Sequence, residues 1–250
     1  MLDMKKLFLL LLLTLFGAQS ATGHVLEELW NKYSEKGRPA KTVPAAHTPG
    51  KILGKPQGAG EAAFRYPWKY RAKTYELHFA DPAELAQGIH SLAVFAHDVS
   101  PDLPREKFYG GVLGFHYSAR QIADWLNSVV SRHETLTPKE NAFAGLMLEE
   151  GIIGLGPQGF EPKSAIAHVL GAAPGKKRTF AQNLRHERLH VFWDEDKALR
   201  NREEKAWGSL DPAQKARERE ALKNYAQDNE AQILEEWAVK RAEKSRMSIR

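Results

Sequence analysis

Hydrophobic and polar positions alternate in some segments of the chain and follow helical spacing in others, which predicts both strands and helices. The alternation from Tyr75 to Phe79 predicts a strand, and the apolar residues 165–170 predict a second, buried strand. Helices are expected over residues 81–89, 118–130 and 137–147, each beginning at a polar capping residue. The pattern therefore predicts an α+β fold that is predominantly helical and contains a small sheet.

The N-terminal residues have the pattern of an export signal. Two lysines precede an apolar run at residues 7–16, and small side chains at Ala18 and Ser20 are typical of cleavage before Ala21. The run is shorter than the roughly 20 residues that span a bilayer. We expect residues 1–20 to be a signal peptide, with an uncleaved anchor as the alternative, and the protein to be secreted or periplasmic without a transmembrane span after signal removal.

Proline and glycine recur through residues 21–60, so this stretch is expected to be an extended arm or linker with little fixed structure. A pro-segment that covers a cleft is a further possibility for it. Residues 61–250 are expected to form one folded domain.

Composition limits the chemistry that the domain can perform. The 250 residues are 42% hydrophobic and 27% charged, and contain no cysteine. Disulfides, thiolate metal sites and cysteine nucleophiles are therefore excluded, and any metal must bind histidine and carboxylate side chains. The formal net charge of +5 is a mild excess, and no phosphate-binding loop or nucleic-acid patch is evident, so no nucleic-acid partner is expected.

One segment carries a specific chemical pattern. Thr179 and Gln182 form a capping box, which predicts a helix that begins shortly before His186. Within that helix His186 and His190 are one turn apart and share a face, with Glu187 beside them. Two imidazoles at this spacing can both bind one Zn²⁺, and the carboxylate between them can reach a metal-activated water without binding the metal.

The remaining positions of this helix agree with a partly buried metal helix. Phe180, Leu184 and Val191 lie beside the histidine face, whereas Arg185 and Arg188 lie largely opposite and are expected to point to solvent. The alternative is a charged helix with two partly exposed histidines that bind nothing.

A third ligand is expected from the C-terminal part of the chain. Asp211 and Pro212 predict the start of one long helix that continues to about residue 244. On its helical wheel Glu230 falls within the apolar stripe, Glu236 at its margin and Glu235 nearly opposite. A carboxylate within an apolar stripe needs a partner, which is either a metal ion or one of the many basic side chains.

These residues resemble the zincin metallopeptidases, and among them the gluzincins, whose third ligand is a glutamate on a later helix. Asn229-Glu230-Ala231 is similar to their ligand motif, and Glu235 begins an alternative E-x-x-A form. The pattern His186-Glu187-x-x-His190 is written HExxH below, and the helix that carries it is the HExxH helix. The resemblance implies a zincin-like domain in which a small sheet packs on this helix, followed by a long C-terminal glutamate helix. It implies that His186, His190 and Glu230 bind Zn²⁺. Arg188 is a departure, since these motifs usually have an uncharged residue at its position.

The activity that this implies is amide-bond hydrolysis by an exported zinc-dependent metallopeptidase, through a metal-activated water with Glu187 as general base. The substrate is a peptide, a protein or a cell-wall amide. Tyr225 and His168 are candidates to stabilise the oxyanion, and Asp194 is a candidate to orient an imidazole. The other histidines, His116 among them, show no ligand spacing and are interpreted as ordinary.

Two alternatives belong to other functional classes. A non-catalytic envelope binding or structural protein would keep a structural or vestigial metal site without an open coordination position. A basic binding module would bind an anionic polymer and no metal.

Overall fold

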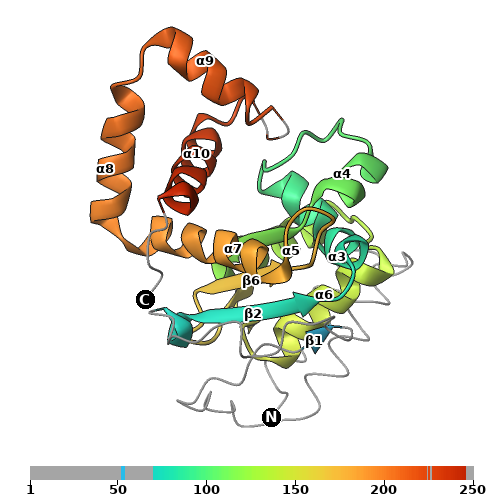
Figure 1. Cartoon of the computed structure of the whole chain (residues 1–250). Coiled ribbons are helices and arrows are strands. Elements are labelled where there is room, and N and C mark those ends of the chain that lie inside the picture. The colour runs from blue at the N-terminus through green and yellow to red at the C-terminus, as the bar shows by residue number, and fades with distance from the viewer. Residues whose placement is uncertain (1–51, 54–69, 224, 226, 246–250) are drawn as a thin grey trace, which may run out of the picture.

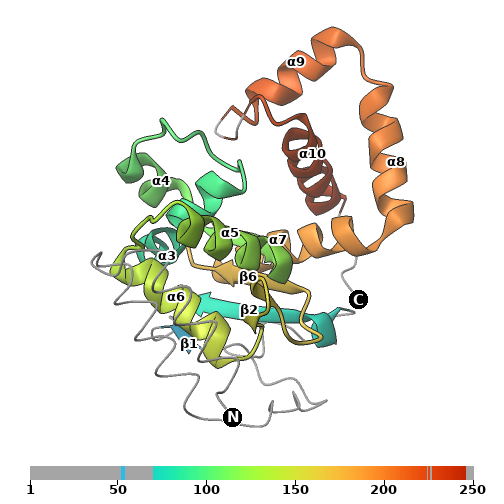
Figure 2. The same cartoon turned by 180° about the vertical axis from the view of Figure 1, so that it is seen from behind.

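A small sheet and a set of C-terminal helices lie on opposite sides of one central helix, α7 (Figures 1 and 2). The computed structural model describes residues 52–53, 70–223, 225 and 227–245. The strands are β1 (Ile52–Leu53), β2 (Thr74–Phe79), β3 (Gly114–Ser118), β4 (Ile153–Gly156), β5 (Gly159–Pro162) and β6 (His168–Ala172). The helices are η2 (Arg71–Lys73), α3 (Pro82–Phe95), α4 (Arg105–Gly111), α5 (Ala119–Ser131), α6 (Pro138–Glu149), α7 (Phe180–Glu195), α8 (Lys197–Gly208), α9 (Pro212–Glu220) and α10 (Glu230–Lys244). The α+β, predominantly helical class is thus confirmed.

The larger sheet has the strand order β1-β2-β6-β3. Strands β1, β2 and β6 are parallel, whereas β3 pairs antiparallel with β6 and forms an edge. In this register His116 lies opposite Leu170, and Leu170 lies opposite Glu76 on the other side. Since side chains that are paired across strands share a face, alternate residues of all three strands point to the same side of the sheet.

One face of the sheet is apolar and forms the main core. Leu77, Phe115 and Val169 project from this face and are almost fully buried. They belong to the same core as apolar side chains of α3, α5 and α6, including Ile89, Ile122 and Met147. This burial fixes the sheet and therefore the direction of every side chain on the opposite face.

The opposite face packs against α7 and is partly polar. Leu170 and Ala172 pack with apolar side chains of α7, including Leu184. Beside them Arg188 of α7 donates two hydrogen bonds to Glu76 of β2, at 2.7 and 2.8 Å. The prediction that Arg188 points to solvent is therefore wrong. A charged residue is tolerated within the motif because a carboxylate from the sheet neutralises it.

The C-terminal part of the chain is not one long helix. Helix α9 ends at Glu220 and α10 begins at Glu230, so the predicted continuous helix is broken between them. An apolar cluster that includes Trp193, Trp207 and Ile233 joins the end of α7 to α8 and α10. A second contact joins Leu189 of α7 to Val239 and Ala242 of α10. These contacts hold α10 against the HExxH helix.

The other predicted elements are confirmed with small shifts. The strand expected over residues 165–170 begins at His168, and the helices expected after Asp81, Ser118 and Thr137 each begin at the next residue. Residues 1–20 lie outside the described residues, and so does most of 21–60, in which Ile52–Leu53 pairs with β2. Within the described ranges, no helix combines the length and apolar character that crossing a bilayer requires.

Candidate metal centre

Helix α7 carries the HExxH residues into the interior. Its capping box at Thr179 and Gln182 has both reciprocal hydrogen bonds, which confirms the predicted helix start. His186, Glu187 and His190 are 9%, 6% and 7% exposed. Their burial follows from the position of α7, which packs against the sheet on one side and α10 on the other. The alternative interpretation, a charged helix with two partly exposed histidines, therefore does not describe this helix.

Glu236 of α10 lies between the two imidazoles. Its Oε2 is 3.6 Å from Nε2 of His186, and its Oε1 is 3.4 Å from Nε2 of His190. The Oε2 atom is buried and has no hydrogen-bond partner. Donor atoms of these three residues all lie within 4.8 Å of one another, as required of ligands to one ion.

The separations fit a small divalent cation better than direct hydrogen bonds. Two ligands at about 2.05 Å from a tetrahedral ion are about 3.4 Å apart, from simple geometry. The two contacts of Glu236 at 3.4 and 3.6 Å are close to that value and longer than ordinary hydrogen bonds. A buried carboxylate oxygen without a partner is costly, and an ion at this point would satisfy it. The donor set of two imidazoles and one carboxylate suits Zn²⁺.

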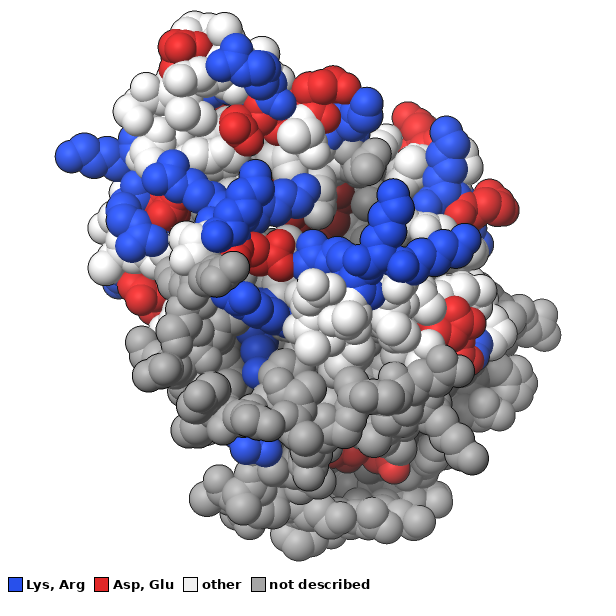
Figure 3. All heavy atoms as spheres, in the orientation of Figure 1, with Lys and Arg blue, Asp and Glu red and all other residues white. Residues whose placement is uncertain are grey.

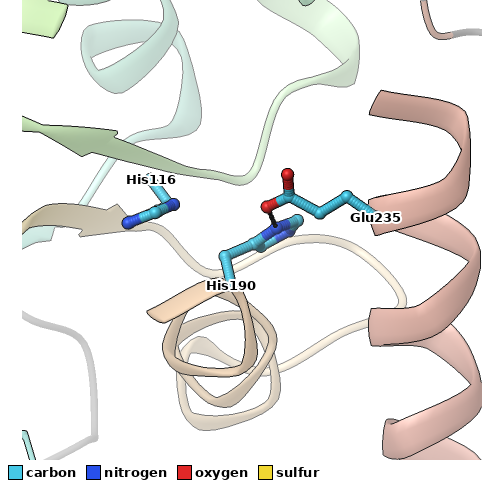
Figure 4. A group of neighbouring side chains, drawn as sticks. All are labelled: His116, His190 and Glu235. Atoms are coloured by element: carbon cyan, nitrogen blue, oxygen red, sulfur yellow. Dashed lines mark hydrogen bonds and ion pairs between the residues drawn. The ribbon is translucent and has the colours of Figure 1, made fainter. Parts of the chain in front are cut away.

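Two further carboxylates of α10 face the other nitrogens of the rings. Glu235 Oε1 is 2.6 Å from Nδ1 of His190 (Figure 4), and Glu243 Oε2 is 3.3 Å from Nδ1 of His186. A carboxylate that accepts the Nδ1–H of an imidazole leaves Nε2 free to bind a metal. His116, His190 and Glu235 also bring donor atoms within 4.8 Å. The short contact of Glu235 favours a role in holding the ring.

The charges around the histidines create a demand for a cation. Burial alone would lower the pKa of His186 and His190, but neighbouring carboxylates outweigh it. Glu236 and Glu243 raise the pKa of His186 to about 9. Glu236 and Glu235 raise the pKa of His190 to about 10. Burial would raise the pKa of Glu236, yet His190 and His186 lower it to about 2. The field that retains protons on both rings also favours a divalent ion in their place.

Glu187 lies beside this group and is not among the three ligand candidates. Burial raises its pKa to about 7, although the two histidines act in the opposite direction. A carboxylate with a pKa near neutrality can both accept and return a proton. The backbone of Gly114 on β3 lies against it, because a Cβ built at Gly114 would be 2.2 Å from Oε1 of Glu187. The edge strand thus fixes the position of the Glu187 side chain.

The structure does not bring Glu230 to the histidines. Its Oε1 accepts a hydrogen bond of 3.1 Å from the indole nitrogen of Trp207, and its Oε2 pairs with Arg219. Glu230 is the first residue of α10, which is a separate helix. A helical wheel that continues from α9 therefore assigns Glu230 to the wrong face. Arg219 is thus the basic partner of Glu230, which was the alternative to a metal ion. Glu236, and not Glu230, lies beside the two histidines.

Four other residues lie near the centre. The Tyr225 hydroxyl contacts Glu236, which brings this oxyanion candidate to the site. His168 and Asp194 instead lie with His116, whose ring stacks on His190 at a centroid distance of 5.9 Å. Burial lowers the pKa of His116 well below its usual value, and His190 and His168 act in the same direction. Helical spacing could not reveal His116 or His168, because they lie on different strands.

Charges of both signs are mixed on the surface. Lys and Arg side chains form a band across the face in Figure 3, and acidic side chains lie among and above them. Several basic side chains are paired with acids, including Lys73 with Glu195 and Lys139 with Glu84. Such pairing favours a solvated mixed surface over a site for an anionic polymer.

Comparisons with protein-family models, with curated protein sequences and with solved structures returned no match.

Proposed function

We propose that this protein is an exported zinc-dependent metallopeptidase with a zincin-like domain, which hydrolyses amide bonds of a peptide, a protein or a cell-wall crosslink. His186, His190 and Glu236 are the proposed zinc ligands, and Glu187 is the proposed general base. Glu236 replaces Glu230 in the ligand set that the sequence suggested. Export rests on the signal-like residues 1–20, which lie outside the described residues.

One observation carries this proposal: Glu236 reaches from a separate helix to the Nε2 atoms of both HExxH histidines. Two histidines that only pack in the core would not explain why Oε2 of Glu236 is buried beside them without a hydrogen-bond partner. Three protein ligands leave a tetrahedral ion one open position, as in catalytic zinc sites.

When bound, Zn²⁺ polarises a carbonyl group and makes water more acidic. Glu187 takes the proton from the attacking water and delivers it to the leaving amine. Glu235 hydrogen-bonds to His190 and keeps its ring oriented, and Glu243 faces Nδ1 of His186 at ion-pair distance. Tyr225, whose hydroxyl contacts Glu236, is the proposed donor to a developing oxyanion.

The edge strand supports an extended peptide as the substrate. Among the described strands β3 ends the sheet, and its Gly114 lies against Glu187. An edge strand has unpaired backbone groups that can bind an extended chain by strand addition. A peptide paired with β3 would pass directly beside the proposed general base.

The test compares zinc content and hydrolysis in matched variants. The purified full chain is stripped with a chelator and reloaded with Zn²⁺, and its zinc content and cleavage of a quenched-fluorescence peptide library are measured. Glu187→Gln should keep the metal at this centre and lose about 10²- to 10⁴-fold in kcat. Glu236→Ala should lose both this metal and activity.

Glu230→Ala is the matched control, because it removes a glutamate of the same helix outside the proposed ligand set. It should keep both zinc and activity. Loss of zinc in Glu230→Ala but not in Glu236→Ala would contradict the ligand assignment. Zinc binding without cleavage of any library peptide by the unaltered chain would favour the non-catalytic alternative.

A further inference from the structure

A second group of possible metal ligands lies next to the proposed zinc centre. His116 of β3, His168 of β6 and Asp194 of α7 bring donor atoms within 4.8 Å of one another. The two histidines share the α7-facing side of the sheet, since His116 pairs with Leu170 and His168 is two residues before it. Asp194 is one turn beyond His190 on the helix that covers this face.

The three donor atoms form a triangle with two nearly equal sides and one shorter side. Nε2 of His116 is 3.0 Å from Nδ1 of His168, and Oδ2 of Asp194 is 3.6 and 3.7 Å from these two nitrogens. A tetrahedral ion with ligands at about 2.05 Å separates them by about 3.4 Å. The hydrogen bond between the rings explains the shortest side but not the approach of Asp194, which is beyond hydrogen-bond distance from both nitrogens.

Glu195 holds the ring of His168 so that its Nδ1 faces the other two residues. Oε1 of Glu195 is 3.0 Å from Nε2 of His168, and Oε2 of Glu195 accepts a hydrogen bond from Lys73 at 2.8 Å. A carboxylate that accepts the Nε2–H of an imidazole leaves the lone pair of that ring on Nδ1. Nδ1 of His168 faces Nε2 of His116 at 3.0 Å, so a bound ion would replace the proton between the two rings. The proposed zinc centre has the same arrangement, with the roles of the two ring nitrogens exchanged.

Access also differs within the group. The side chains of His116 and His168 are 8% and 6% exposed, whereas that of Asp194 is 38% exposed. The rings are thus held by the protein, and the carboxylate lies towards solvent, from which an ion can enter.

We propose that His116, His168 and Asp194 form a second binding site for a divalent transition-metal ion, distinct from the centre at His186, His190 and Glu236. Two imidazoles and one carboxylate suit first-row dications such as Zn²⁺ or Fe²⁺. The two sites adjoin through the stacked rings of His116 and His190. This inference does not depend on peptidase activity, because it concerns metal binding alone.

Zinc stoichiometry tests the proposal. The full chain is stripped with a chelator, titrated with Zn²⁺, separated from free metal and analysed for bound zinc per chain. The unaltered chain should bind two ions, and His168→Ala and His186→Ala should each bind one. The double variant should bind none. Binding of a single ion by the unaltered chain, or of two ions by His168→Ala, would overturn the second site.

Two further variants make the result specific. Asp194→Asn keeps the size of the side chain and should also lose one ion, so it tests the site if His168→Ala does not fold. His133→Asn removes a histidine that lies outside the ligand groups formed by the described residues, and should keep both ions. A single ion that is lost in His186→Ala but kept in His168→Ala leaves the proposed peptidase intact. A single ion with the opposite pattern contradicts the proposed peptidase instead.

Discussion

At the scale of the residue, the candidate centre is defined by an excess of carboxylates around two imidazoles. Glu235, Glu236 and Glu243 all come from α10 and approach His186 or His190. Glu236 and Glu243 are seven residues apart, two helical turns, so both face α7. Burying this much negative charge is favourable only with compensating positive charge, which protons supply in the absence of a metal.

Gly114 gives a residue-scale prediction. A Cβ at this position would collide with the end of Glu187, so Gly114→Ala should displace the carboxylate without removing a ligand. We expect zinc content to be unchanged and kcat/KM for a cleaved peptide to fall about 10²-fold, because small displacements of a reacting group are costly. Gly145→Ala is the control, since nothing lies within 4 Å of its added Cβ. Equal activity of both variants would show that β3 does not position Glu187.

At the scale of the element, the phase of each helix decides which side chains meet. The capping box at Thr179 predicts the start of α7 and therefore the shared face of His186 and His190. Glu230 falls within the apolar stripe only if one helix continues across residues 221–229. Asn229 caps a new helix, in which Glu236 is buried and Glu230 is exposed near Trp207. The break resets the phase.

The contact between α7 and β2 gives an element-scale prediction. Glu76→Gln should lower the free energy of unfolding by up to about 3–5 kcal/mol, since it removes the negative charge that pairs with Arg188, whose side chain is 11% exposed. The double variant Glu76→Leu with Arg188→Met should cost less than Glu76→Gln alone, because it removes both charges. Urea denaturation measures each value.

The control for the Glu76 and Arg188 variants is an exposed ion pair. Lys139→Met removes the contact with Glu84, in which both side chains are about half exposed, and should change stability by less than about 1 kcal/mol. A loss for Glu76→Gln as small as that for Lys139→Met would show that the buried pair does not hold α7 on the sheet.

At the scale of the whole molecule, the proposed zinc ion would join two parts of the fold. The ligands come from α7, which lies on the sheet, and from α10, which closes the C-terminal group of helices (Figure 1). Leu189, Val239 and Ala242 form the apolar contact between these helices. Metal binding is therefore expected to stabilise the packing of α10 on α7.

This gives a prediction for metal removal. Zn²⁺ at 100 times its Kd should raise the free energy of unfolding by about 2.7 kcal/mol for each occupied site, because it binds the folded chain. Thermal unfolding with and without a chelator measures the change, and hydrogen exchange should show slower exchange in α10 with metal. His186→Ala with His168→Ala should show no response to Zn²⁺. An equal response in that double variant would place the stabilising ion elsewhere.

The sequence by itself determined the local features of this protein. Capping residues set the starts of α3, α5, α6 and α7, and the spacing of His186, Glu187 and His190 follows from helical periodicity alone. These are interactions within a few residues, so their signals are written in adjacent positions.

Only the tertiary structure decided which distant side chains join them. It brought Glu236, and not Glu230, to the histidines, and packed Arg188 against Glu76. It also brought His116 and His168, from separate strands, to the face of the sheet that packs against α7. The pairing of strands and the packing of α10 depend on apolar contacts across the whole chain, and no local pattern encodes them.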